Sequence, residues 1–229
     1  MVGGYAEYVA VEEDNVALVP ASVTDEQAAI AACSIGTVLN GIRDVGRVSI
    51  GDRVLVTGAG GGLGVHAVQL ARLAGAYVIA QTTSPDKAAM IESLGADATV
   101  VSARGEDFSA RIRELTAGEG VDALIDNVGT PLFSAMRRSL AVSGRWILIG
   151  QLTGDFVPFN PAQLFLRNQS MLSVHSTTRA QLEDSLALIA RGSIRPVISG
   201  IHPLSEIREV HERVERGGVP GRIVVRPGA

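Results

Sequence analysis

The chain has very little cysteine, lysine and aromatic residue. Its 229 residues include one cysteine, a single lysine and only 4% aromatic residues. Because Cys33 stands alone, no internal disulfide bond can form, which suits a reducing compartment. Lys87 is the sole lysine, so arginine supplies the other basic side chains. The sequence therefore excludes a disulfide-stapled scaffold and any chemistry that needs two lysines.

Blocks of one charge and long apolar runs are also missing. The formal net charge is −4 and no basic block occurs, so we expect no nucleic-acid partner. The segment Met1–Glu7 has neither the basic region nor the apolar region of a signal peptide. Gly, Arg and Asp interrupt every apolar stretch before it reaches the length of a membrane span. These absences predict a cytoplasmic protein without a membrane partner.

The most informative feature that is present is a segment with five glycines. It follows an apolar strand pattern, Arg53–Val56, and precedes a helix pattern, Val65–Ala76. Glycines permit a tight turn and a close approach to a ligand, and the helix N-terminus behind them can bind a pyrophosphate. A glycine-rich turn without a ligand is the alternative. The predicted cofactor contacts here are Gly60, Gly61, Gly62, Leu63 and Gly64.

Strand and helix patterns alternate after Gly51. Helical spacing relates Leu132, Met136 and Leu140, and Ser84 followed by Pro85 is typical of a helix start. The alternation predicts an α/β fold, a doubly wound six-stranded parallel sheet of the dinucleotide-binding (Rossmann) type. The predicted strands are Val54–Val56, Tyr77–Ala80, Thr99–Val101, Ala123–Ile125, Trp146–Ile149 and Leu172–Val174.

The two ends do not follow this alternation. Tyr5–Val11 reads as an unpartnered strand, and Thr24 with Gln27 forms a capping-box pattern for a helix that reaches about Asp44. We expect a second, incomplete sheet domain shared between the ends, and divide the chain into residues 1–35, 36–176 and 177–229. The C-terminal pieces are a helix through Leu182 and Ile189, an extended stretch (Ile194–Ile198), a helix through Ile207 and Val214, and a strand (Arg222–Val225).

Five short motifs along the chain are informative in combination: Gly3–Val9, Gly51–Gly64, Leu94–Asp97, Gly192–Pro196 and Pro220–Val225. Together they resemble the C-terminal part of a medium-chain dehydrogenase/reductase, the group of zinc-binding alcohol dehydrogenases and quinone reductases. The resemblance implies an NAD(P)H-dependent oxidoreductase that acts on a small alcohol, aldehyde, ketone or quinone. It also implies a GroES-like catalytic domain that is nearly all absent here, with remnants at both termini. Met1 would then be an internal or misassigned start.

The residue that follows the second predicted strand bears on the choice of cofactor. In NAD-binding folds an acidic residue about twenty positions past the glycines holds the ribose 2′-hydroxyl. Thr82 stands there, whereas an aspartate would repel a 2′-phosphate by about 4 kcal/mol at contact distance. Thr83, Ser84 and Lys87 add hydroxyls and a positive charge, so NADP(H) is favoured over NAD(H). The alternative is that Ser84 only caps a helix and Lys87 is solvated, and Asp86 weakens the case.

Other predicted contacts lie where later strands end, because ligands bind at the carboxyl edge of such sheets. They are Asn127, Val128 and Gly129 after the fourth strand, and Gly150 and Gln151 after the fifth. The resemblance implies that these loops contact the ribose and nicotinamide. It also implies that His175 faces the nicotinamide side and that Arg222 reaches the pyrophosphate.

Cys33 has two interpretations. In zinc-dependent members of the group a cysteine ligand lies in a Cys-x-x-x-Thr segment, which Cys33 and Thr37 match. The resemblance thus implies a metal-ligand role for Cys33 in an intact protein and a catalytic role for Thr37 beside the nicotinamide. The alternative is a small buried cysteine on an alanine-rich helix. Catalytic zinc needs three protein ligands, so we expect this chain to be metal-free.

Three functions stay open. The first, which we choose, is zinc-type alcohol dehydrogenase chemistry, with hydride transfer between nicotinamide and an alcohol or carbonyl. The second is a zinc-independent NADPH:quinone or enoyl reductase, and the third is a non-catalytic dinucleotide-binding module. Lys87 as the only lysine rules out the Tyr-x-x-x-Lys pair of short-chain dehydrogenases. For this chain we expect cofactor binding with little turnover. The open edge of the sixth strand could pair with a second copy and form a homodimer.

Overall fold

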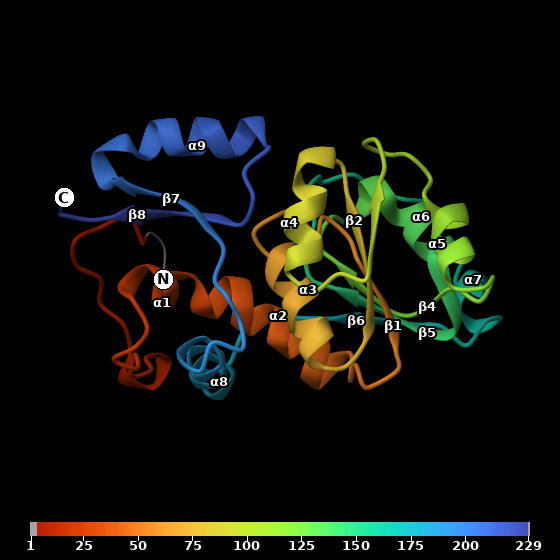
Figure 1. Ribbon diagram of the computed structural model, residues 1–229, viewed down its shortest axis with the longest axis horizontal. Coiled ribbons are helices and arrows are strands. Elements are labelled where there is room, and N and C mark those ends of the chain that lie inside the picture. Colours follow the sequence, from red (N-terminus) through yellow and green to blue (C-terminus); the bar gives the residue numbers. More distant parts are fainter. Residues whose placement is uncertain (1–3, 229) are drawn as a thin grey trace.

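The structure is a computed structural model that describes residues 4–228. Met1 and Gly3, on which the expected start and the first motif depend, lie outside the described residues. Figure 1 shows a larger part, which holds the main sheet, beside a smaller part, which holds both ends of the chain. One long helix runs from the smaller part to the larger and connects them.

Six parallel strands form the main sheet in the order β3-β2-β1-β4-β5-β6. This order confirms the predicted doubly wound six-stranded parallel sheet. Successive strands are added toward one edge from β1 to β3 and toward the other edge from β4 to β6, so the strand order reverses between β1 and β4. In folds of this kind ligands bind in the crevice at that switch point. The strands are β1 (Arg53–Val56), β2 (Tyr77–Thr82), β3 (Ala98–Val101), β4 (Val121–Asp126), β5 (Leu140–Leu148) and β6 (Ser170–Ser173).

Both faces of the sheet are covered, which explains why its strands are apolar at consecutive positions. Val54 and Val56 point into a core shared with α3 (Gly64–Leu73), α4 (Ala88–Ser93) and α8 (Arg179–Ala190). Leu55 points into a second core on the opposite face, because successive strand residues face opposite sides. That core includes the buried Trp146. It is closed by α5 (Ser109–Leu115) and α6 (Phe133–Ser139).

The connecting helix, called the junction helix below, spans Asp25–Val45 without a break. It begins at the predicted capping box, in which Thr24 and Gln27 exchange side-chain and backbone hydrogen bonds. The predicted domain boundary between residues 35 and 36 falls inside it. Its parts are α1 (Asp25–Ile30), a π-helical segment (Ala31–Gly36), α2 (Thr37–Leu39) and a second π-helical segment (Asn40–Val45).

The junction helix has 21 residues, and an 18-residue stretch of it has a mean hydropathy of 1.2. By length and composition alone the helix could cross a membrane. The expectation that no apolar stretch reaches that length is therefore wrong for this helix. Half of that stretch is buried within the fold, where Ile35, Val38 and Ile42 belong to the core. Packing against the main sheet accounts for its apolar composition.

The ends of the chain differ from prediction. Tyr5–Val11 forms no strand, and neither described sheet includes a strand from this segment. The second sheet has two parallel strands, β7 (Ile198–Pro203) and β8 (Arg222–Arg226), which both come from the C-terminal region. Among residues 4–228 this sheet is therefore not shared between the two ends. The predicted helix through Ile207 and Val214 is present as α9 (Ile207–Arg216).

Leu140 is a further correction. Helical spacing placed it at the end of α6, but it is the first residue of β5. The backbone becomes extended at Leu140, and the pairing of β5 with β4 contains a register irregularity before Arg145. Leu140 is nevertheless buried in the same core as Met136. Spacing alone identified the buried side chain without showing where the helix ends.

We predict that Gly64→Ala destabilises the fold by about 2 kcal/mol or more. A β-carbon on Gly64 would lie 2.2 Å from the Gly58 carbonyl oxygen and 2.6 Å from Ala59 Cα, and neither backbone atom can yield cheaply. Urea unfolding followed by circular dichroism measures the change. Gly154→Ala is the matched control because no atom lies within 4 Å of its added β-carbon. Equal midpoints for the two variants would contradict the prediction.

Candidate functional site

The glycine-rich segment forms the loop between β1 and α3, at the carboxyl edge of the main sheet. β2 holds its start: Gly58 N–H donates to the Gln81 side-chain carbonyl (3.1 Å) and Ala59 N–H to the Gln81 main-chain carbonyl (2.9 Å). Gly58 has a left-handed φ of 59°, which favours glycine. Gly64 then lets α3 begin in direct contact with the loop. The N-terminus of a ten-residue helix therefore lies directly behind the loop.

The side chain of Lys87 lies across Gly60. A β-carbon on Gly60 would come within 2.6 Å of Lys87 Cδ. The ammonium group donates hydrogen bonds to the Val219 carbonyl (3.0 Å) and the Gly60 carbonyl (3.4 Å). Partial burial lowers the pKa of Lys87. The only lysine in the chain is thus held against the loop by neutral carbonyls, without a carboxylate partner among the described ion pairs.

Arg222, the first residue of β8, lies against the loop at Gly62. A β-carbon on Gly62 would lie 2.5 Å from Arg222 Nε and 2.9 Å from its Cζ. Arg222 Nε donates to Ser34 Oγ (2.7 Å), and its Nη2 lies 3.7 Å from Cys33 Sγ on the same helix. Two cations from distant parts of the sequence therefore approach the loop at the two positions where only glycine leaves room.

Thr82 and Ser84 form the turn that returns Lys87 to the loop. Thr82 is buried, and its hydroxyl accepts a hydrogen bond from Ser84 N–H (3.2 Å), whereas Thr83 is exposed. The side chain of Ser84 caps no helix, so that prediction is wrong. A short 3-10 turn (Pro85–Lys87) comes first, and α4 has only six residues. In this segment it is the side chain of Lys87 that reaches the glycine loop.

The loops after β4 and β5 pack against the glycine loop. Asn127 Nδ2 donates to the Thr57 carbonyl (2.9 Å), and a β-carbon on Gly58 would lie 3.0 Å from Val128. Gly129 has φ 83°, and the Gln151 side chain fills the place where its β-carbon would be. A β-carbon on Gly150 would lie 2.8 Å from the Asn127 carbonyl oxygen. The structure therefore brings these five predicted residues together beside the loop at the switch point.

Asp126, the last residue of β4, organises the loop that follows this strand at the carboxyl edge of the sheet, called the crest below. The sequence patterns did not identify it. Its buried carboxylate accepts hydrogen bonds from Val128 N–H (3.0 Å), Gly129 N–H (2.8 Å) and the Trp146 indole (3.0 Å). Burial outweighs these donors and raises the pKa of Asp126. A cavity of about 370 Å³ opens beside the turn, lined in part by Phe133, Leu148 and Gln151. A polar residue at the end of an apolar strand was the available signal.

Cys33 is exposed, so the interpretation as a small buried core cysteine is wrong. Thr37 lies one turn further along the junction helix, half-buried, and its hydroxyl donates to the Ala32 carbonyl (3.5 Å). Within residues 4–228 no group of three His, Cys, Asp or Glu side chains could hold a metal ion. The described residues therefore do not fit a zinc site by themselves.

Comparison with known proteins agrees with this geometry. The family model described as zinc-binding dehydrogenase matches residues 62–191, more than half of the chain. The chain belongs to the zinc-binding dehydrogenase family. Members of this family, within the medium-chain dehydrogenase/reductase superfamily that the motifs indicated, include NAD(P)-dependent oxidoreductases.

Individual relatives of the chain carry different substrate names. Acryloyl-coenzyme A reductase of Sulfurisphaera tokodaii is 33% identical over 98% of the chain, which spans 66% of that relative's length. The crystal structure of an NAD-dependent alcohol dehydrogenase is 34% identical with a TM-score of 0.90, over 99% of this chain and 66% of that one. A mycobacterial protein solved with NADPH is 30% identical with a TM-score of 0.81, over 91% and 68%.

His175, another predicted contact, lies toward the β6 edge of the main sheet. It is exposed and follows β6, which is two strands from β4. At the usual strand spacing of about 4.8 Å this amounts to roughly 10 Å across the sheet. No hydrogen bond links it to the glycine loop among the described residues.

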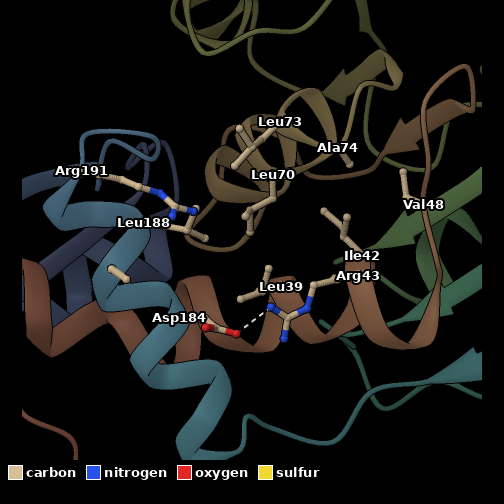
Figure 2. Close-up of a pocket in the computed structure, with 11 residues that line it drawn as sticks. Leu39, Ile42, Arg43, Val48, Leu70, Leu73, Ala74, Asp184, Leu188 and Arg191 are labelled. Atoms are coloured by element: carbon tan, nitrogen blue, oxygen red, sulfur yellow. Dashed lines mark hydrogen bonds and ion pairs between the residues drawn. The ribbon is translucent and has the colours of Figure 1, made fainter.

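A groove lies away from the glycine loop, as Figure 2 shows. It has a volume of about 400 Å³ and runs between α3, α8 and the junction helix, with the Arg43–Asp184 ion pair (2.7 Å) on one wall. Leu70 and Leu73 line it from the last turns of α3, whereas the glycine loop meets the first turn. None of the predicted contact residues is among those that line it.

His66 is a fully buried polar residue of α3. Its Nδ1 lies 3.1 Å from the Gly62 carbonyl, and its Nε2 accepts a hydrogen bond from Val197 N–H (3.2 Å). This pair of partners requires the neutral ring with its proton on Nδ1. Burial, with a smaller contribution from the charge of Arg222, lowers the pKa of His66 to about 4.

We predict a matching dependence of stability on pH. Between pH 6.5 and 4 the unfolded chain binds a proton at His66 that the folded chain does not, so stability falls as the pH falls through this range. The loss attributable to His66 should reach about 3 kcal/mol. Urea unfolding of the wild type and of His66→Gln, which cannot titrate here, measures the difference. Parallel curves for both proteins would count against a depressed pKa.

Proposed function

We propose that this chain binds NADP(H) with the pyrophosphate on the glycine loop, at Gly60, Gly61, Gly62, Leu63 and Gly64. The observation that carries the proposal is the pair of cations, Lys87 and Arg222, packed against the loop at Gly60 and Gly62. A loop that is followed by a helix N-terminus and flanked by two positive side chains suits a diphosphate better than any neutral ligand. The loop's position at the switch point between β1 and β4 supports the same assignment.

For the 2′-phosphate we propose Thr82, Thr83, Ser84 and Lys87. The carboxylate that would repel a phosphate is absent at Thr82, and the exposed Thr83 and half-buried Ser84 offer hydroxyls. Lys87 is held by two carbonyls rather than a carboxylate, so its ammonium can exchange them for a phosphate oxygen at little cost. A relative solved with NADPH is consistent with this preference.

For the nicotinamide end we propose contacts from the loops that the crest brings together, Asn127, Val128, Gly129, Gly150 and Gln151. Thr37 would face the ring as a catalytic residue, with His175 at the outer edge of the same side. The nicotinamide, when bound, supplies the hydride. The residues of this chain would orient the ring and exclude water from one of its faces. We propose an alcohol, aldehyde, ketone or quinone as the reacting partner.

Zinc would require ligands from outside the described residues. Cys33 is exposed, as a ligand inherited from zinc-dependent relatives would be, but one thiolate cannot supply the three protein ligands of a catalytic site. We therefore derive no step through a metal for this chain. In an intact protein, a cysteine and a His-Glu pair from the missing catalytic domain would complete the site.

A second candidate function is reduction of a carbon–carbon double bond conjugated to a thioester. The relatives named acryloyl-coenzyme A reductase, at 33% and 34% identity, favour it. The two candidates separate in an assay of the intact gene product with a short aldehyde and with acryloyl-coenzyme A. Alcohol dehydrogenase chemistry predicts aldehyde turnover that a chelator abolishes, whereas the double-bond reductase needs no metal.

The chain spans about two thirds of the length of these relatives, so turnover is proposed for the longer protein only. We propose the division into residues 1–35, 36–176 and 177–229, in which the outer segments belong to the catalytic domain. The β6 edge, paired only with β5 among the described strands, could form a homodimer. A cytoplasmic location without nucleic-acid or membrane partners stays a prediction.

We predict that the chain binds NADPH more tightly than NADH and that Thr82→Asp reverses this order. Aspartate can still accept the hydrogen bond from Ser84 N–H, but its charge repels the 2′-phosphate and can hold a 2′-hydroxyl instead. We expect NADPH affinity to fall at least about tenfold. Titration of cofactor fluorescence measures both constants. Ala110→Asp, on the exposed face of α5, controls for added charge, and an unchanged NADPH preference in Thr82→Asp would refute the assignment.

We predict that Lys87→Gln lowers the affinity for NADPH about tenfold more than the affinity for NADH, because both cofactors carry the diphosphate but only NADPH carries the 2′-phosphate. The glutamine amide can still donate to a carbonyl of the loop but carries no charge for the 2′-phosphate. Each protein is titrated with both cofactors, so NADH serves as the internal control. An equal loss for both would show that Lys87 acts on the loop and not on the 2′-phosphate.

A further inference from the structure

The polar residues that α3 buries against the C-terminal segment connect the glycine loop to Arg222. We propose that His66 is a positioning residue of the nucleotide site, which fixes the Arg222 guanidinium over Gly62 so that it can hold a diphosphate. This inference rests on the proposed function, because it assigns how that site is assembled. It concerns a residue that contacts neither the ligand nor the reacting atoms.

Four hydrogen-bonded or packed contacts form a closed circuit. The Gly62 carbonyl faces His66 Nδ1 (3.1 Å), and His66 Nε2 accepts from Val197 N–H (3.2 Å). The carbonyl of the same Val197 accepts from Arg222 N–H (3.0 Å). The guanidinium of Arg222 then returns to Gly62, where an added β-carbon would lie 2.5 Å from Nε. One imidazole thus sets the separation between the loop and the backbone that carries the arginine.

Neighbouring contacts leave this circuit little freedom. Gly221 has φ 63°, and a β-carbon there would lie 2.3 Å from the Val197 carbonyl oxygen, so the chain turns tightly onto Val197. Gln69, one turn after His66, exchanges two hydrogen bonds with Arg195: the Gln69 amide donates to the Arg195 carbonyl (3.0 Å) and accepts from its N–H (2.8 Å). Residues three apart share a helix face, so His66 and Gln69 together fix this short segment on α3.

The chemistry of the ring explains why a polar residue is kept at a fully buried position. His66 is completely inaccessible to solvent, and apart from Gln69 the other buried residues of α3 are apolar or glycine. Leucine there would leave the Gly62 carbonyl and the Val197 N–H without this partner, and each orphaned group is free to move the segment it belongs to. Glutamine can donate with its amide and accept with its carbonyl, so it can replace both contacts.

The test measures dissociation constants of NADPH, ADP-ribose and adenosine 2′-monophosphate for the folded chain by fluorescence and competition. His66→Leu should weaken NADPH and ADP-ribose about tenfold, and His66→Gln should restore binding to within about threefold of the wild type. Adenosine 2′-monophosphate, which lacks the diphosphate, should bind His66→Leu and wild type equally. Arg222→Gln should also cost about tenfold, and adding His66→Leu to it should cost little more, because both remove one interaction.

Leu70→Ala is the control for stability, since it opens a cavity on the same helix away from the loop. It should lower the unfolding midpoint while leaving NADPH affinity unchanged below that midpoint. Full additivity of His66→Leu and Arg222→Gln, or equal losses for all three ligands, would overturn the positioning role. If the wild type binds neither NADPH nor NADH, the proposed function itself fails, which is a separate result.

Discussion

The carbonyl of Gly58 and the α-carbon of Gly64 lie closer together than any side chain would allow, and the arrangement at the crest of the sheet depends on that approach. It lets α3 begin at the loop, which aims the helix N-terminus at the space above β1. It also places the buried Gly60 against Lys87 and the half-buried Gly62 against Arg222. A larger residue at any of these positions would move either the helix or a cation.

The loop is held from several directions, and each partner comes from a different part of the chain. Gln81 of β2 holds its beginning, Asn127 holds Thr57 beneath it, and His66 holds Gly62 at its end. Arg222 reaches it from a strand of the second sheet. The C-terminal segment is therefore part of the proposed nucleotide site, although it lies almost entirely outside the main sheet.

Much of the fold could be predicted because burial on both faces of a parallel sheet leaves a readable pattern. Short apolar runs separated by helical spacing indicated all six strands, and the capping box at Thr24 and Gln27 indicated the start of the junction helix. Leu140 and Ser84 were misplaced because helix and turn boundaries depend on local hydrogen bonds. Ser84 does precede a helical turn, but its side chain accepts no hydrogen bond from that turn.

The site was harder to predict where it depends on contacts between distant residues. Glycine spacing indicated the loop, but no local pattern links His66 to Val197 or Arg222 to Ser34. Gln81 and Asp126 carried a weak signal, as polar residues on apolar strands. The terminal strand pattern at Tyr5–Val11 had no partner in the described chain, so alternation alone could not make it a strand.

The contact between Trp146 and Asp126 has a practical consequence. Trp146 is the only tryptophan in the chain, it is fully buried, and its indole donates to the carboxylate that shapes the turn at Val128 and Gly129. Its ultraviolet emission therefore comes from one defined place, directly behind the crest of the sheet. A reduced nicotinamide absorbs at the wavelengths where tryptophan emits, so the molecule carries an intrinsic optical reporter of occupancy that needs no added label.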